Sequence, residues 1–194
     1  MSPVVASAAG AFAVAAALAL APSARAQTAS APERFSAAAI DPNRGTTSMV
    51  DIAVEWWTSD EEHDRLFTAL LEHGPDKLLD VLRDAPTVGF VKRPGNLSWD
   101  LRYARRLALP DGGERVVVAT DRPVSFWEAT NQPRTIDYPF TVIELRLNHD
   151  GEGEGKMSIA TRITADKEHR MVTLENWDLQ PVMLKSVKRE RSTH

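Results

Sequence analysis

Apolar and polar residues alternate in one segment after another between Met49 and Val187, and this alternation constrains the fold more than any other feature of the sequence. A period of two residues places successive side chains on opposite faces of an extended chain, as in a half-buried β-strand. The expected strands cover 49–57, 88–92, 98–109, 115–120, 141–148, 156–164, 171–175 and 182–187. Turns rich in Gly, Pro, Asn and Asp separate most of them, which predicts antiparallel pairing of consecutive strands.

Two helices are expected between the first and second of these strands. The run S-D-E-E at 59–62 is a capping box with acids in the first turn, and leucines four residues apart follow it. Gly74 suits the end of this helix, and Pro75 suits the start of a second helix that ends before Pro86. The sequence therefore predicts an α+β fold. It is an antiparallel β-meander of seven or eight strands with an N-terminal helical hairpin packed on it. The sheet either closes into a barrel or curves and packs the hairpin on its concave side.

In the first strand, the alternation places four apolar residues on one buried face, and these are Val50, Ile52, Val54 and Trp56.

The first 26 residues have the composition of an export signal. The run from Val4 to Ala21 is almost wholly apolar, and Ala24-Arg25-Ala26 has the small-x-small form of a signal-peptidase site. A transmembrane anchor is the alternative, but the run is marginal in length and consists mostly of alanine. We therefore expect cleavage, export to the periplasm or the medium, and no stable membrane anchor afterwards.

The chain accordingly divides into four segments. We expect a signal peptide over 1–26, a flexible lead-in rich in Ala, Ser, Thr and Pro over 27–47, a single β-rich globular domain over 48–188, and a tail over 189–194. Removal of the signal leaves 194 − 26 = 168 residues, a length that suits one domain with a sizeable core.

Charge and cysteine content exclude several classes of function. A net charge of −4 without a basic tract argues against nucleic acid as a partner. The chain has no cysteine, which excludes disulfides, thiol catalysis and lipid attachment after the signal. The expected partner is an unidentified small molecule or protein.

The stretch from Thr120 to Phe140 is the first candidate for a site, because it is longer than a strand connection requires. It combines aromatic rings with charged and amide groups, the usual make-up of a binding pocket. The candidate ligand-binding residues are Arg122, Trp127, Glu128, Asn131, Arg134, Asp137 and Tyr138. The alternative is architectural: the aromatic side chains close the open end of the sheet, and the charges pair with one another.

Arg105 is the second candidate. It shares its phase in the alternation with the apolar face formed by Trp99, Leu101, Tyr103, Leu107 and Leu109. A buried guanidinium is costly unless it is paired, so we expect a carboxylate beside it or a pocket for an anionic group. The alternatives are a bulge at 105–106 that turns the side chain outward, or a side chain that reaches the rim.

No metal site, cofactor or catalytic residue is assigned. The oxygen-rich loop Asn148–Gly155 resembles a calcium loop, but Ile159 stands where the bidentate acid would be required. The five histidines have no metal-ligand spacing, and no Gly-x-Ser-x-Gly occurs. Asp121, Glu128 and Asp137 could still converge in space as paired carboxylates.

Several motifs together resemble a family of uncharacterised exported bacterial proteins. They are V-E-W-W-T-S-D-E-E, L-R-Y-A-R, V-A-T-D-R-P-V-S-F-W-E-A, N-Q-P-R-T-I-D-Y-P-F-T and G-E-G-K-M-S. The resemblance covers about Val54 to Val187, and it implies export and a single domain. The family has no established activity, so the resemblance implies no site residue.

Three functions remain open. We favour a non-catalytic ligand-binding or interaction module that uses the loop 120–140. The first alternative is an acid–base enzyme, an isomerase or hydrolase with carboxylates and Arg in the same region. The second is a purely structural or partner-docking protein.

Overall fold

The structure is a computed structural model that describes residues 31–93, 98–124, 139–166, 171–176 and 180–190. The described residues form ten strands and two helices. These are β1 (Glu33–Asp41), β2 (Thr46–Val54), α1 (Asp60–His73), α2 (Pro75–Asp84), β3 (Gly89–Lys92), β4 (Ser98–Leu101), β5 (Tyr103–Ala108), β6 (Glu114–Thr120), β7 (Phe140–Leu147), β8 (Glu152–Asp166), β9 (Met171–Asn176) and β10 (Val182–Glu190).

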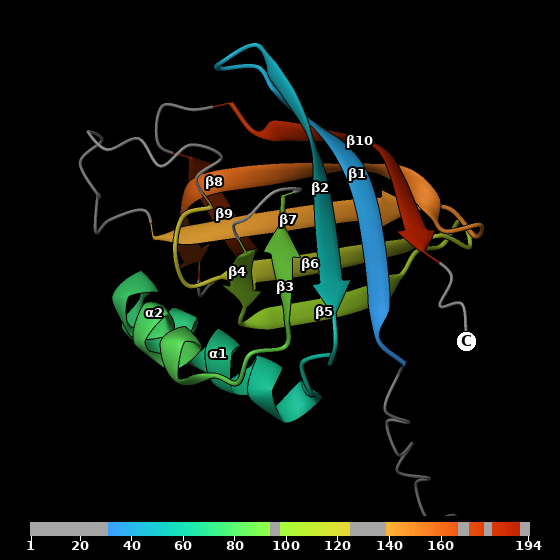
Figure 1. Cartoon of the computed structure of the whole chain (residues 1–194). Coiled ribbons are helices and arrows are strands. Elements are labelled where there is room, and N and C mark those ends of the chain that lie inside the picture. Colours follow the sequence, from blue (N-terminus) through green and yellow to red (C-terminus); the bar gives the residue numbers. More distant parts are fainter. Residues whose placement is uncertain (1–30, 94–97, 125–138, 167–170, 177–179, 191–194) are drawn as a thin grey trace, which may run out of the picture.

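All ten strands belong to one antiparallel sheet that curls into a nearly closed barrel (Figure 1). The strand order is β4-β3-β2-β1-β10-β8-β7-β6-β5, and β9 pairs with β8 outside this path. β4 and β5 are consecutive in the chain and are separated only by a bend at Arg102. One bent stretch therefore joins both ends of the strand order. The antiparallel, barrel-like sheet with two helices confirms the coarse fold prediction.

The topology differs from the predicted meander in detail. β4 to β1 and β8 to β5 are two runs of consecutive neighbours, and β10 inserts between them. The count rises to ten strands because the predicted strand 98–109 divides at Arg102 and because β1 was not expected.

The prediction of a flexible lead-in over 27–47 is wrong for residues 33–41. Phe35, Ala37 and Ala39 all face the barrel interior with at most 2% of their surface exposed. Small side chains suffice there because β2 and β10 pair with β1 on both sides.

The barrel interior is filled with apolar side chains that we call the inner core. Its fully buried members include Ile52 and Val54 from β2, Leu101 from β4, and Ile143 and Leu145 from β7. Every strand of the closed path places alternate residues in this core or at its ends, as the period-two pattern requires.

The helical hairpin begins and ends as its sequence predicts. The Ser59 hydroxyl accepts a hydrogen bond from the Glu62 N–H at 3.1 Å and caps α1. Gly74 separates the helices with a φ of +83°, a conformation that favours glycine, and Pro75 opens α2.

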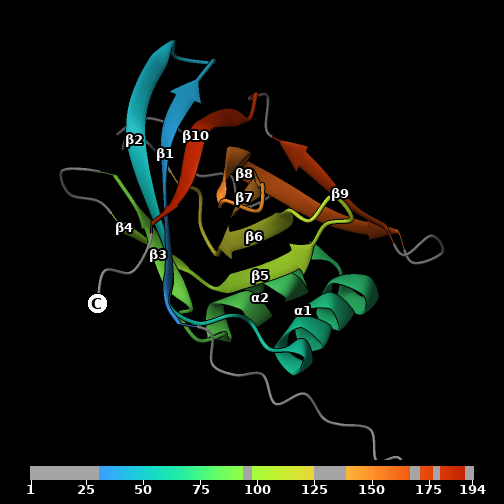
Figure 2. The same ribbon diagram turned by 90° about the vertical axis from the view of Figure 1, so that its right-hand side faces the viewer.

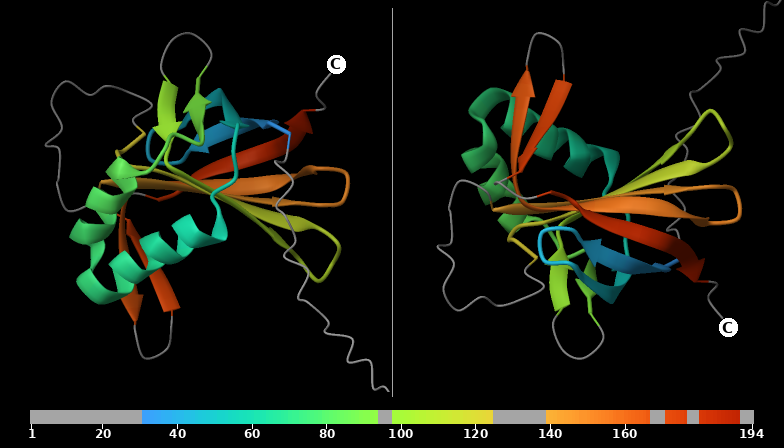
Figure 3. Two further views of the ribbon diagram at one scale, coloured as in Figure 1. Left: turned by 90° about the horizontal axis from the view of Figure 1, so that it is seen from below. Right: turned by 90° about the horizontal axis from the view of Figure 1, so that it is seen from above.

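The helices cover the outer face of the barrel rather than a concave side (Figure 3). Leu66, Leu70, Leu79 and their neighbours pack against Val142 of β7 and the outward residues of β6 and β8, and we call this second cluster the outer layer.

β8 takes part in both layers because its alternation is interrupted. Ala160 has a φ of +51°, and the pairing of β7 with β8 shifts register between Phe140 and Val142. Met157 therefore lies in the inner core, whereas Ile163 lies in the outer layer. The second half of β8 pairs with β9 from Thr161 to Asp166, and this hairpin projects from the barrel (Figures 2 and 3).

The predicted signal peptide, 1–26, lies outside the described residues, so cleavage and export stay predictions. β10 extends to Glu190, two residues beyond the predicted end of the domain. Within the described ranges, no helix is long and apolar enough to cross a membrane.

Candidate functional site

Most of the predicted site falls in the segment 125–138, which the structure does not describe. Six candidates lie outside the described residues, namely Trp127, Glu128, Asn131, Arg134, Asp137 and Tyr138. Their role in binding stays a prediction, and so does any convergence of Glu128 and Asp137 with Asp121. Arg122 and Arg105 are described.

Arg122 contributes its backbone to a buried corner, whereas its side chain is exposed. Its carbonyl oxygen accepts a hydrogen bond from the Thr120 hydroxyl. The Thr141 hydroxyl in turn accepts from the Val124 N–H at 2.7 Å. Asp121, which precedes Arg122 in the chain, has a carboxylate oxygen 3.5 Å from Nε of Arg102. These contacts fasten the end of β6 to β7 and to the bend between β4 and β5, which is an architectural role.

Arg105 does not share a face with Trp99 and Leu101, so that prediction is wrong. The bend at Arg102 shifts the alternation by one residue, and Ala104, with no exposed surface, takes the inward position. Arg102 holds the bend by donating to the carbonyl oxygen of Ala85 at 3.0 Å. Arg105 consequently points to the outer face. Its Nη2 lies 2.7 Å from a carboxylate oxygen of Asp60, so the expected acidic partner is present.

A tyrosine–histidine pair lies beside Arg105. The Tyr103 hydroxyl is 3.0 Å from Nδ1 of His63, and the His63 ring stacks on Phe67. Burial lowers the pKa of His63, and Arg105 lowers it further, while Asp64 and Asp60 raise it. Burial raises the pKa of Tyr103, against a smaller opposing effect of Arg105. Both shifts favour the neutral forms, so a neutral phenol and a neutral imidazole share this hydrogen bond.

Four charged side chains close one end of the barrel, and we call them the barrel-end cluster. They are Glu33, Arg106, Glu114 and Arg189. Glu33 bridges Nη1 of Arg106 at 2.7 Å and Nε of Arg189 at 3.0 Å, and Arg189 also contacts Glu114.

Both guanidinium groups of this cluster also lie over aromatic rings. Arg106 lies 4.9 Å from the ring centroid of Trp57, and Arg189 lies 5.6 Å from that of Phe35. Two acids and two bases balance within the cluster, so its geometry favours a structural seal over an ion-binding site.

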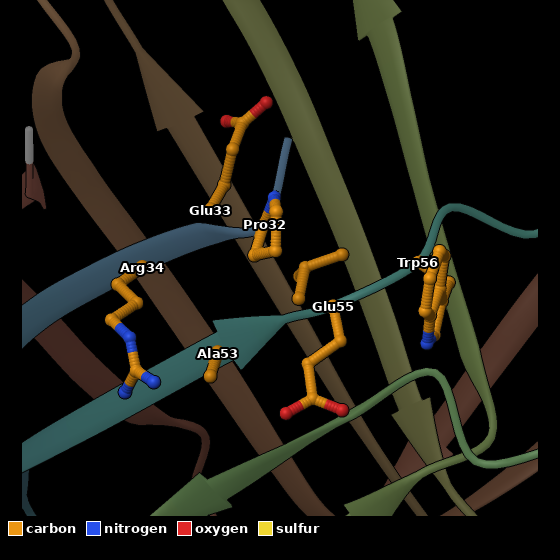
Figure 4. A pocket seen from close by; sticks show the side chains of 7 residues that line it. Pro32, Glu33, Arg34, Ala53, Glu55 and Trp56 are labelled. Carbon is orange, nitrogen blue, oxygen red and sulfur yellow. The ribbon is translucent and has the colours of Figure 1, made fainter. Parts of the chain in front are cut away.

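The larger of the two best-formed depressions lies on the outside, where β1 begins and β2 ends (Figure 4). We call it the Trp56 depression. It has a volume of about 230 Å³ and is lined by Pro32, Glu33, Arg34, Ala53, Val54, Glu55 and Trp56. Arg34 and Glu55 point to the same side, and Glu33 points the other way, toward the barrel-end cluster. Ala53 provides a small, 3% exposed floor.

The position of Trp56 corrects the predicted buried face of the first strand. β2 ends at Val54, and the N–H groups of Glu55 and Trp56 both donate to the carbonyl oxygen of Val88, at 2.9 and 3.1 Å. This irregular pairing turns Trp57 toward the inner core and leaves Trp56 60% exposed. Arg34 is steadied by the Phe90 ring, whose centroid lies 5.8 Å from its guanidinium carbon. No local signal marks Arg34 or Trp56 as site residues, since one lay in the expected lead-in and the other on an expected buried face.

The second depression, of about 170 Å³, lies at the β1–β2 turn and is lined by Ala39, Asp41, Thr46, Thr47, Ser48, Arg93 and Val182. Neither depression reaches Tyr103 or His63. Among the residues that the structure describes, no three His, Asp or Glu side chains are grouped to hold a metal ion.

The oxygen-rich segment 148–155 comprises the tight β7–β8 turn at 148–151 and the first residues of β8. The Asn148 side chain accepts hydrogen bonds from the N–H groups of Asp150 and Glu152, both at 3.0 Å, so the polar composition of this loop serves the turn.

No protein-family model matches this chain, and no curated protein or solved structure shows significant similarity to it. A functional assignment therefore rests on the side chains described above, and the resemblance to an exported family stays a prediction.

Proposed function

We propose that the protein is an exported, non-catalytic binding module whose Trp56 depression receives one polyhydroxylated ring, such as a sugar ring, of a larger ligand. One observation carries the proposal: an indole that is 60% exposed borders the larger of the two best-formed depressions, and the lining of this depression also includes a guanidinium and a carboxylate. Exposed tryptophan combined with polar groups of fixed direction is typical of recognition surfaces.

The size of the depression sets the size of the group. A volume of about 230 Å³ is smaller than the roughly 300–1,000 Å³ of pockets for drug-sized ligands. Covering the exposed part of an indole removes on the order of 100–150 Å² from water, worth about 2–4 kcal/mol before binding costs. One ring alone would therefore bind only at about millimolar concentration, so useful affinity needs further contacts from the same ligand.

The charges favour a neutral ring with hydroxyl groups. Arg34 supplies only donors and Glu55 only acceptors, so hydroxyls, which donate and accept, can satisfy both. The Glu55 carboxylate would repel an acidic ligand, and the Arg34 guanidinium would repel a basic one. Stacking on Trp56 uses the apolar face of the same ring.

Binding of defined oligosaccharides, measured by isothermal titration calorimetry, tests the proposal. Trp56→Ala should weaken binding at least tenfold, Trp56→Phe should retain most of it, and Arg34→Gln should give an intermediate loss. Met49→Ala, which removes another apolar side chain that is 49% exposed, is the matched control. A panel without any binder, or equal affinity for the wild type and Trp56→Ala, would contradict the proposal.

A second candidate function is acid–base catalysis at Tyr103 and His63, favoured by their hydrogen bond and their opposite pKa shifts. It ranks lower because neither of the two depressions gives a substrate access to them. An isomerase or hydrolase activity that survives both Tyr103→Phe and His63→Gln in folded protein would eliminate this site.

A further inference from the structure

The outer edge of β9 is an open edge of the sheet among the described strands. β9 pairs with β8 along Thr161–Asp166, and no described strand pairs with its other side. β4 and β5 also pair on one side each, but they are two halves of one bent stretch. An open edge presents a row of N–H and C=O groups that another strand can use.

The outer layer continues onto this edge. Leu174 is opposite Ile163, and Val172 is opposite Ala165, and opposite residues of a strand pair share a face. Ile163 and Ala165 pack in the layer beneath the helices, whereas Val172 and Leu174 are 42% and 37% exposed. The apolar strip therefore extends beyond the cover that α1 and α2 provide, along the β8–β9 hairpin that projects from the barrel in Figure 3.

β9 lacks three of the usual protections of an edge strand, namely proline, lysine and a β-bulge. Its sequence, M-V-T-L-E-N, holds no proline and no lysine, and its pairing with β8 has no register shift. A two-stranded ribbon is also only marginally stable by itself. A further strand added at the open edge of β9 would stabilise the ribbon and would also cover the apolar strip.

We propose that a second copy of this chain occupies the edge, so that two β9 strands pair antiparallel in a β8–β9–β9–β8 sheet. A two-fold axis perpendicular to the sheet keeps each face on its own side. With the axis at Thr173, that residue lies opposite itself, and Val172 of each copy lies opposite Leu174 of the other.

This register pairs apolar with apolar and threonine with threonine, both favourable cross-strand combinations. The two Glu175 side chains lie at opposite ends of the pairing, so no like charges oppose each other. The strand is therefore complementary to itself. The short interface predicts a weak, concentration-dependent dimer.

Sedimentation velocity over a range of concentrations tests the pairing. The full chain should shift from monomer to dimer as its concentration rises, and Leu174→Lys should shift the dissociation constant at least tenfold upward. Met49→Lys is the matched control, since it charges another exposed apolar residue, on β2, and should leave the dimer intact. Circular dichroism confirms that each variant is folded.

Single cysteines test the register, because the chain has none of its own. Thr173→Cys should give cross-linked dimers on oxidation or with a short thiol cross-linker, and exposed Thr68→Cys on α1 should give far fewer. A wild type that stays monomeric at every concentration overturns the proposal, whatever other partner β9 binds. A dimer that Leu174→Lys leaves unchanged, or equal cross-linking at both positions, overturns it as well.

Discussion

The outer layer lies on β5 to β8, which also contribute to the inner core, but only the inner core is enclosed. The inner core is enclosed because the strand order returns on itself through the bend at Arg102. The outer layer has no such closure: two helices cover its centre, and Val172 and Leu174 carry it outward onto an exposed hairpin. β8 contributes side chains to both layers, because its alternation is interrupted once, at Ala160.

We infer from this difference that the inner core serves stability and that the outside of the barrel serves recognition. Side chains in the enclosed core have no access to a ligand, and their contribution is to stability. Both of our proposals, at Trp56 and at β9, concern the outside of the barrel, where the pattern is interrupted or the sheet is left open. The following predictions test whether stability and recognition are separated in this way.

The largest expected effect separates the two apolar layers directly. Leu145→Ala creates a cavity in the inner core, where the side chain is fully buried, and should lower the free energy of unfolding by about 3–5 kcal/mol. Leu79→Ala in the outer layer, at 6% exposure, should cost about 2–3 kcal/mol, because the helices can settle into the gap. Urea denaturation measures both. An equal or larger loss for Leu79→Ala would remove the distinction between the layers.

A smaller effect is expected at the barrel-end cluster. Glu33 is 16% exposed and bridges two guanidinium groups, so Glu33→Gln should cost about 1–3 kcal/mol. The exposed pair of Glu154 with Lys185 is the matched control, and Glu154→Gln should stay within about 0.5 kcal/mol. If thermal denaturation finds the two variants equally stable, the cluster does not seal the barrel.

The smallest effect concerns pH at the junction of α1 and β5. The groups that face His63 are Asp60, Asp64, Tyr103 and Arg105. The folded-state pKa of His63 lies below its ordinary 6.5, so the unfolded chain binds the proton more readily. The stabilising contribution is therefore complete above about pH 6.5 and is lost as the pH falls through the lower, folded-state value.

Comparison with His63→Gln isolates this contribution. The wild type should lose more stability than the variant between pH 8 and pH 5, as measured by urea denaturation at each pH. Parallel pH curves for the two proteins would show that the histidine does not titrate differently on folding.

The sequence was sufficient to predict the elements whose structure is decided by local chemistry. The start of α1 at Ser59 and its end at Gly74 follow from a hydroxyl cap and a left-handed glycine, and β7 begins within one residue of its predicted position. β1 was missed because Ala37 and Ala39 offer little apolar surface until two neighbouring strands enclose them.

The candidate site was less predictable than the fold, because distant contacts place its residues. Trp56 is turned outward by two hydrogen bonds to Val88, and Arg105 by a bend that Arg102 holds through its hydrogen bond to Ala85 at the end of α2. Neither contact is encoded in the neighbouring sequence. An acidic partner was expected for a buried Arg105. Asp60 is such a partner, but the pair lies on the outer face, where the Arg105 side chain is 27% exposed.

The pairing of β1 with β10 has a consequence for the order of events in folding. It brings Arg34 beside Glu190 and Ile40 beside Met183, so the two ends of the described chain meet in adjacent strands. Contacts of such long sequence separation form slowly, and these cannot form until the chain has been synthesised as far as β10. Until then β1 and β8 each lack a neighbour, so a chain truncated before Val182 would be left with two unpaired edges and a strong tendency to aggregate.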